Sequence, residues 1–324
     1  MDWHYINLDF DGSIPAQSEL SKRLEKSINL TDIGKSIRLW GSESQMHQLR
    51  ERVRRLRLEY PGKWLTFYGS GDFNHVSSVL LETLPESQQP VHLVLLDNHP
   101  DWFSLPPKYH CGNWVATALR NKAIASALLM GQDSSDLKGR DFHFMPFQDL
   151  ANGRLNIIPY SKENVLVPLK FRLNVKGARS TEVTPMGINI RFDTVTKLKD
   201  GFIKNVREAL KGKNVYLAID KDVLAPAFAQ TDWDQGKMTL ETLQGIITEV
   251  FGVANIVGID VCGERAPTAL RGIAKKVDAG RVFHNFFHND SEEFVEATKV
   301  NQKTNLRLMD TLLHRLLTQE VLSQ

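Results

Sequence analysis

Short apolar runs alternate with longer amphipathic stretches along this chain, and that alternation limits its fold more than any other feature. The runs predicted to be buried strands are residues 5–8, 64–68, 92–96, 142–147, 215–219 and 256–259. The stretches predicted to be helices are residues 45–60, 76–84, 201–210, 240–251 and 301–317. Strands that alternate with helices form a mostly parallel sheet with helices on both faces. The sequence therefore predicts a three-layer α/β/α fold.

The length of the chain and its polar segments indicate how many domains to expect. A chain of 324 residues is long enough to bury one large core. Residues 132–140 and 170–185 are polar or rich in Gly and Pro, and we interpret them as surface connections, not as domain boundaries. We therefore expect a single α/β domain over residues 1–324.

Composition argues against several classes of protein. The 40 basic and 38 acidic residues nearly balance, at a formal net charge of +2, which gives no electrostatic reason to expect nucleic acid or an anionic membrane as a partner. No apolar stretch is long enough to span a bilayer, and no secretory signal is visible. With only two cysteines, Cys111 and Cys262, a disulfide framework is excluded, and we expect a cytoplasmic protein.

One predicted strand runs directly into a set of candidate metal ligands. Residues 92–96 are followed by Asp97, His99 and Asp101, which alternate with Asn98 and Pro100. Every second side chain of an extended chain points the same way, so these three can converge on one ligand. The position also fits, because sites in parallel sheets form beyond the carboxyl ends of the strands.

Two further strand ends offer similar side chains. The strand at 215–219 ends in Asp220 and Asp222, and the strand at 64–68 is followed by Asp72 and His75. Each motif alone is weak, because an Asp at a strand end is more often a helix cap or a loop residue. Together they favour a metal site.

The negative charge of these carboxylates indicates how many ions to expect. Asp97, Asp101, Asp220 and Asp222 would bring four negative charges into one crevice, where they would repel one another without cations. Two divalent ions would neutralise them. An oxygen-rich ligand set with two histidines suits Mn²⁺.

At these residues the sequence resembles the ureohydrolase superfamily of arginases, agmatinases and formimidoylglutamases. That family carries Gly-Gly-Asp-His, Asp-Ala-His-x-Asp and Ser-x-Asp-x-Asp motifs in this order, and the corresponding segments here are residues 69–75, 97–101 and 218–222. The resemblance covers roughly residues 64–270. It implies an arginase-like fold and a hydrolase that cleaves a non-peptide C–N bond of a guanidino, amidino or formimino compound.

The resemblance also implies a role for each candidate metal ligand. Asp97 and Asp220 would bridge two ions, and a hydroxide between the ions would be hydrogen-bonded to Asp101. The remaining ligands would each complete the shell of one ion: His75 and Asp101 for the first, His99 and Asp222 for the second.

Two more positions match residues that act on the substrate in that family. His110, which stands before Cys111 and Gly112, resembles the histidine that moves a proton, and Glu264 resembles the glutamate that binds the guanidinium group. In arginases the loop after the second motif makes polar contacts to the amino acid, but here residues 102–107 are short and apolar, so arginine is not the favoured substrate. The resemblance thus implies a small-molecule substrate, and family members often form homo-oligomers.

Four other interpretations remain open. Asp9 and Asp11 resemble the first motif of haloacid-dehalogenase-like phosphatases, although no convincing downstream partners follow. A deacetylase-like amidohydrolase would use the same architecture with one Zn²⁺. The site could also be a metal-binding element without catalysis. Cys111 as a nucleophile is the weakest alternative, and a buried structural thiol is favoured over it.

Overall fold

A parallel β-sheet forms the centre of the computed structural model, which describes residues 3–103, 109–137, 145–167, 175–197, 206–268, 270, 275 and 291–322. Eight strands make up this sheet, and each pairs in parallel with its neighbours. In spatial order they are β2 (Lys26–Asn29), β1 (Trp3–Asp9), β4 (Lys63–Phe67), β13 (Asn255–Cys262), β12 (Asn214–Asp220), β5 (Val91–Leu96), β7 (Ser126–Met130) and β8 (Leu155–Ile158).

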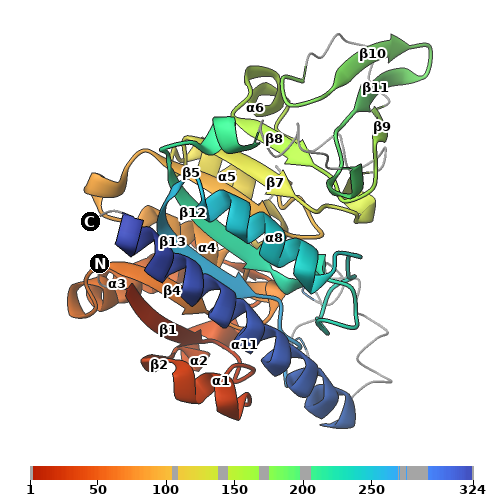
Figure 1. The fold of residues 1–324 in the computed structure, drawn as a ribbon. Coiled ribbons are helices and arrows are strands. Elements are labelled where there is room, and N and C mark those ends of the chain that lie inside the picture. Colours follow the sequence, from red (N-terminus) through yellow and green to blue (C-terminus); the bar gives the residue numbers. More distant parts are fainter. Residues whose placement is uncertain are drawn as a thin grey trace.

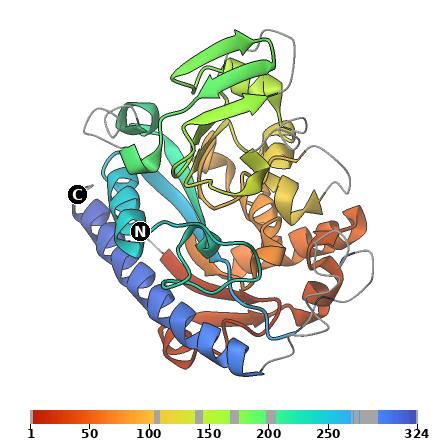
Figure 2. The same ribbon diagram turned by 90° about the vertical axis from the view of Figure 1, so that its right-hand side faces the viewer.

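Helices cover both faces of the sheet, as Figures 1 and 2 show. One face carries α1 (Ser18–Arg23), α8 (Leu240–Phe251) and α11 (Ser291–Leu322), and α11 contacts the other two. The opposite face carries α2 (Thr31–Ile37), α3 (Glu43–Glu59), α4 (Val76–Glu82) and α5 (Trp114–Arg120), which pack in that order. The predicted three-layer α/β/α fold is confirmed.

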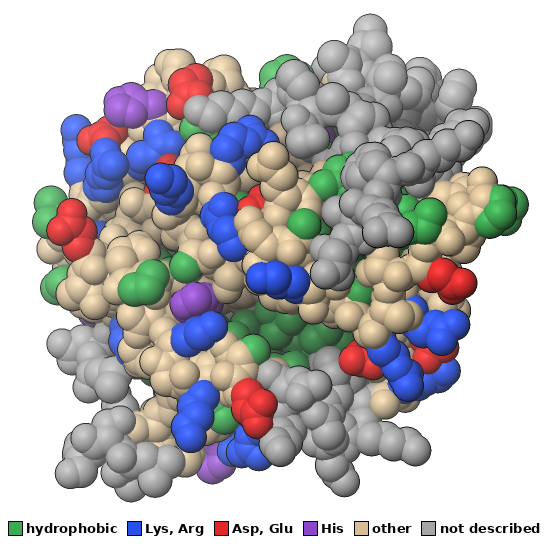
Figure 3. Space-filling model, turned by 90° about the horizontal axis from the view of Figure 1, so that it is seen from above, with side chains coloured by type: hydrophobic (Ala, Val, Ile, Leu, Met, Phe, Trp, Pro, Cys, Tyr) green, Lys and Arg blue, Asp and Glu red, His purple; other side chains and the backbone are tan. Residues whose placement is uncertain are grey.

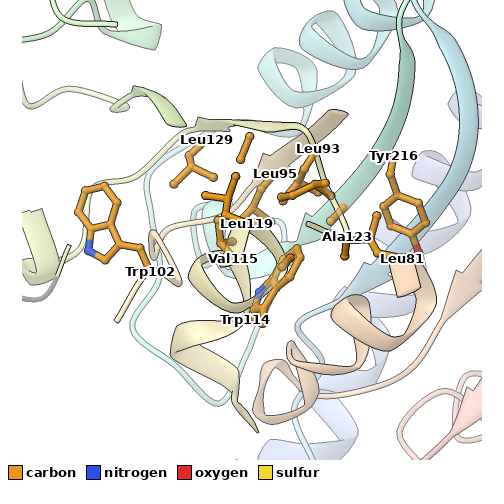
Figure 4. Packing of buried hydrophobic residues seen from close by; sticks show 14 of the residues in the cluster. Leu81, Leu93, Leu95, Trp102, Trp114, Val115, Leu119, Ala123, Leu129 and Tyr216 are labelled. Carbon is orange, nitrogen blue, oxygen red and sulfur yellow. The ribbon is translucent and has the colours of Figure 1, made fainter. Parts of the chain in front are cut away.

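The elements form where local chemistry favours them. β12 is buried along almost its whole length, as expected for a central strand covered on both faces. α8 begins after Thr239, whose hydroxyl accepts a hydrogen bond from the backbone of Thr242, and its apolar residues all face the core. Side chains of β5 and α5 gather in one buried cluster (Figure 4), so the two elements hold each other in place.

Two predictions of secondary structure need correction. The strand predicted at 142–147 is wrong at Phe147, which begins the helix α6 (Phe147–Asn152). Residues 142–144 of this prediction lie outside the described part of the chain. Residues 170–185 contain β10 (Ser180–Thr184), which was taken for a connection. It joins β11 (Gly187–Arg191) and β9 (Asn164–Val167) in a small antiparallel sheet. Since β10 is largely exposed and polar, an apolar pattern could not reveal it.

The strand order brings four carboxyl ends together at one edge of the sheet. β4, β13, β12 and β5 are consecutive neighbours, with Phe67 opposite Val261 and Ile219 opposite Leu96. Residues that follow these strands therefore lie close together.

The described helices are not of the membrane-spanning kind, and the face seen in Figure 3 carries charges of both signs. No helix in the described part of the chain combines the length and the apolar character needed to cross a bilayer. On the face seen in Figure 3, Lys and Arg side chains are interspersed with Asp, Glu and uncharged ones.

Candidate metal centre

Asp97, His99 and Asp222 form the one group of His, Cys, Asp and Glu side chains in the described residues whose ligand atoms all lie within 4.8 Å of one another. The His99 Nδ1 atom is 2.8 Å from Asp222 Oδ2 and 3.7 Å from Asp97 Oδ1. Asp97 and Asp222 are buried and His99 is partly buried. Two carboxylates and an imidazole suit a divalent cation, so the residues present fit one such ion.

Local backbone turns place these three side chains. Asp97 directly follows β5, and its carboxylate accepts a hydrogen bond of 2.6 Å from the backbone of His99. The 3₁₀ turn η7 (Lys221–Val223) follows β12 and presents Asp222, whose Oδ1 accepts from the backbone of Asn98 at 2.9 Å. The predicted convergence of these two strand ends is therefore observed.

Asp234 contacts Nε2 of His99, the ring nitrogen that does not face Asp222, and the sequence motifs did not include this residue. Its Oδ1 is 2.8 Å from Nε2 of His99, and its backbone carbonyl accepts from the Asn98 side chain at 2.8 Å. The ring of Trp233 meets the His99 ring edge-on, with centroids 5.8 Å apart. A carboxylate on the second ring nitrogen fixes the tautomer of a metal-binding histidine. The repeated acidic spacing Asp232-Trp233-Asp234, like that of the third motif, was the available signal.

Asn74 lies where three of the predicted ligand carboxylates meet. Its Nδ2 is 2.8 Å from Asp220, 3.3 Å from Asp101 and 3.5 Å from Asp97. Asp101 also accepts a 2.6 Å hydrogen bond from Nε1 of Trp114, which is buried in the core (Figure 4). Asp101 and Asp220 thus lie at the site, and the side-chain amide of Asn74 contacts both of them.

The role of His75 as a metal ligand stays a prediction. His75 is fully buried at the start of α4, and it is not among the three residues whose ligand atoms cluster. Burial lowers the pKa of His75 to about 3, and the charges of His110 and Lys275 act in the same direction. Asn74, one residue earlier, contacts three of the carboxylates predicted as ligands.

Burial and mutual repulsion control the ionisation of the carboxylates. Burial, reinforced by the charge of Asp222, raises the pKa of Asp97 well above its usual range and that of Asp220 to about 7. Burial and Asp220 also raise the pKa of Asp101, against the effect of His99. Burial alone would lower the pKa of His99, but Asp222 and Asp234 raise it well above its usual value. A cation would relieve this repulsion.

Two glycines leave room for Asp220. A Cβ on Gly263, which has φ of +82°, would lie 2.2 Å from Asp220 Oδ1, and one on Gly71 would lie 2.7 Å from Oδ2. Any side chain at either position would displace this carboxylate.

Glu264 is held by the chain itself. It is buried beside the site, with an ion pair to Lys221, which is also fully buried. Gln17 donates to it at 2.9 Å and Asn305 at 2.7 Å. The carboxylate predicted to bind the guanidinium group of a substrate is therefore paired with the ammonium group of Lys221 in the same chain.

His110 lies at the end of β6 (Tyr109–His110), which pairs with β3 (Trp40–Gly41). Its Nδ1 accepts from the backbone of Gly112 at 2.9 Å. Its role in proton transfer stays a prediction. The neighbouring Cys111 is buried with Leu39, and its Sγ lies 3.7 Å from Nδ1 of His110.

The two acidic residues of the phosphatase-like motif form a turn. Asp9 accepts from the backbone of Gly12 at 2.7 Å, and Asp11 accepts from Ser13 and from the backbone of Ser70. Asp11 thereby connects β1 to the segment that carries Asn74.

A buried arginine connects two loops of the site. Arg38 pairs with Asp72 at 2.7 Å and with Asp232 at 3.4 Å, and Ser70 donates to Asp232 at 2.8 Å. The segment that carries Asp234 is therefore fixed to the segment that carries Asn74.

Comparisons with known proteins identify the fold. No family model and no curated protein matches the chain. Among solved structures, agmatine ureohydrolase of Thermoplasma volcanium is similar, with a TM-score of 0.51 and 14% identity over 92% of this chain and 90% of that one. Proclavaminate amidino hydrolase from Streptomyces clavuligerus gives a TM-score of 0.53 and 16% identity, over 94% of this chain and 92% of that one. Arginase from Medicago truncatula gives 0.53 and 13%, over 94% and 87%. The chain has the arginase-like α/β fold.

Proposed function

We propose that this chain is a divergent member of the ureohydrolase superfamily, a metal-dependent hydrolase that cleaves a non-peptide C–N bond of a small guanidino, amidino or formimino compound. The observation that carries the proposal is the group of Asp97, His99 and Asp222, whose ligand atoms lie within 4.8 Å of one another at the carboxyl ends of β5 and β12. Solved structures with the same fold include proteins named ureohydrolase and amidino hydrolase.

A divalent ion at this site would lower the pKa of water toward neutrality and stabilise negative charge. The chain supplies the remaining functions. Asp234 orients His99, and Trp114 fixes Asp101, which we assign to accept a proton from the attacking water. We assign His110 to protonate the departing amine.

The finer form of the proposal concerns the ions and the substrate. The oxygen-rich donor set supports Mn²⁺. The sequence predicts two ions, with His75, Asp101 and Asp220 completing the shells. Glu264 is not part of the proposal as a substrate ligand, because its carboxylate is paired with Lys221.

A substrate screen tests this proposal. The Mn²⁺-loaded chain is incubated with a panel of guanidino, amidino and formimino compounds, and the release of urea, ammonia and formamide is measured. We expect turnover of one class, lost in Asp222→Asn and kept in the matched surface variant Asp310→Asn, whose carboxylate pairs with Arg23. Retention of the ion without turnover of any compound would contradict the proposed reaction.

A second candidate function needs only one metal ion, and one compact group of ligands is present. Asp97, His99 and Asp222 could serve a deacetylase-like amidohydrolase that uses one Zn²⁺. Acetylated lysine and acetylated polyamines therefore belong in the same panel, with acetate as the product to be measured. Release of acetate by the Zn²⁺-loaded chain, with no urea, ammonia or formamide, would favour this alternative.

A further inference from the structure

The side chain of Asn74 occupies a central position among the acidic residues of the metal centre. Asn74 follows the 3₁₀ turn η1 (Gly71–Phe73) and is buried. Its Nδ2 lies 2.8–3.5 Å from carboxylate oxygens of Asp97, Asp101 and Asp220. These residues come from two different strand ends, so the amide lies at the point where a second cation would have to sit to be shared by them.

The orientation of this amide follows from its other contacts. Oδ1 of Asn74 accepts from Sγ of Cys262 at 2.7 Å and from the hydroxyl of Tyr68 at 3.5 Å. Rotation by half a turn would turn Oδ1 toward the three carboxylates and Nδ2 toward the thiol and the hydroxyl, so both of these donors would lose this acceptor. The donor therefore faces the carboxylates, and a neutral amide nitrogen has no lone pair with which to bind a metal.

The carboxylate oxygens are spaced for hydrogen bonds to an amide. A divalent cation such as Mg²⁺ or Zn²⁺ binds carboxylate oxygens at about 2.0–2.2 Å. Within the described residues, Asp97, Asp101 and Asp220 do not form a second group with ligand atoms inside 4.8 Å. A second ion would require Asn74 to leave and the carboxylates to move inward.

We infer that this chain binds one divalent cation, held by Asp97, His99 and Asp222, and that the amide of Asn74 takes the place of the second cation that the resemblance implies. This inference rests on the proposed metal site. Asp101 and Asp220 then remain anchored by donors of the chain: Trp114 for the first, the backbone of Asp222 for the second, and Asn74 for both.

Counting ions on the full-length chain tests the inference. The metal-free protein is equilibrated with excess Mn²⁺ and freed of unbound ion. Manganese per chain is then measured by atomic emission, and the Mn²⁺ electron paramagnetic resonance spectrum is recorded. We expect one ion per chain and the spectrum of an isolated ion. Two ions with a spin-coupled spectrum would overturn the inference and leave the proposed function standing. No retained ion would overturn the metal site on which both depend.

A pair of matched variants tests the role of the amide. Asn74→Asp replaces the donor with a carboxylate ligand and is expected to double the manganese content to two ions per chain. Asn29→Asp makes the same change on the surface, where Oδ1 of Asn29 accepts from the backbone and hydroxyl of Thr31, so a carboxylate keeps both hydrogen bonds. It is expected to keep one ion. If folded Asn74→Asp holds one ion, or if both variants hold two, the amide is not what excludes the second cation.

Discussion

Replacing Glu264 with Gln is expected to destabilise the fold, and not primarily to weaken substrate binding. Glu264 accepts hydrogen bonds from Gln17 and Asn305 and pairs with Lys221, whose side chain is fully buried. The substitution removes the negative charge and leaves the ammonium group of Lys221 unpaired in the interior. The cost therefore comes from an uncompensated buried charge, whether or not substrate is present.

The size of this effect follows from the burial of the pair. Removing one partner of a buried ion pair costs about 3–5 kcal/mol. Since 1.4 kcal/mol corresponds to a factor of ten, the unfolding equilibrium constant should rise by roughly two to four orders of magnitude. An exposed pair gives a scale for comparison, because such pairs contribute about 0–1 kcal/mol.

Urea unfolding of four proteins measures this effect: the wild type, Glu264→Gln, Lys221→Met and the double variant. Each single variant should lose about 3–5 kcal/mol, and the double variant clearly less than their sum, because it buries no unpaired charge. Glu293→Gln is the matched control, since Glu293 pairs with Arg265 at 2.7 Å but is 46% exposed. Wild-type stability in Glu264→Gln, together with a raised KM for a cationic substrate, would refute this reasoning and restore Glu264 as a substrate ligand.

Two further predictions follow from other buried groups. Asp234→Asn removes the carboxylate from His99 Nε2 and should weaken metal binding about 10–100-fold in a competition titration; unchanged affinity would contradict a positioning role. Asp260→Asn should remove a pH dependence, because burial raises the pKa of Asp260 to about 7 from 3.8. In the unfolded chain this carboxyl group ionises near pH 3.8, but in the folded chain only near pH 7, so the free energy of unfolding falls as pH rises toward 7. Wild type should lose about 2–3 kcal/mol more than this variant between roughly pH 5 and 8 in urea unfolding, and equal losses would contradict the prediction.

The sequence predicted the layered fold because its signal is spread over many residues. Apolar runs that correspond to β4, β5, β12 and β13 each recur between helical stretches, and strands covered on both faces must be apolar throughout. β10 carries no such signal, since it lies in a small sheet and is largely exposed. Pairing with β11 stabilises it, and pairing between distant residues cannot be read from local composition.

The site could be predicted only where spacing decides the direction of a side chain. Asp97, His99 and Asp222 follow strands directly, and the sheet order brings them together. The first motif is different, because the turn η1 separates β4 from its polar residues. In a turn, a shift of one residue changes which side chain faces the site; here Asn74 contacts three of the carboxylates, and the role of His75 stays a prediction.

The distribution of hydrogen-bond donors also bears on the charge at the metal centre. Lys221 stands between Asp220 and Asp222 in the sequence, yet its ammonium group pairs with Glu264 and neutralises neither of them. One divalent ion would offset the charge on Asp97 and Asp222. The other two carboxylates are supported by the indole of Trp114 and the amide of Asn74, which are neutral donors. With Nδ2 toward the carboxylates, the amide presents its positive end to the place of the second cation, and only a rotated amide would offer Oδ1 there as a ligand.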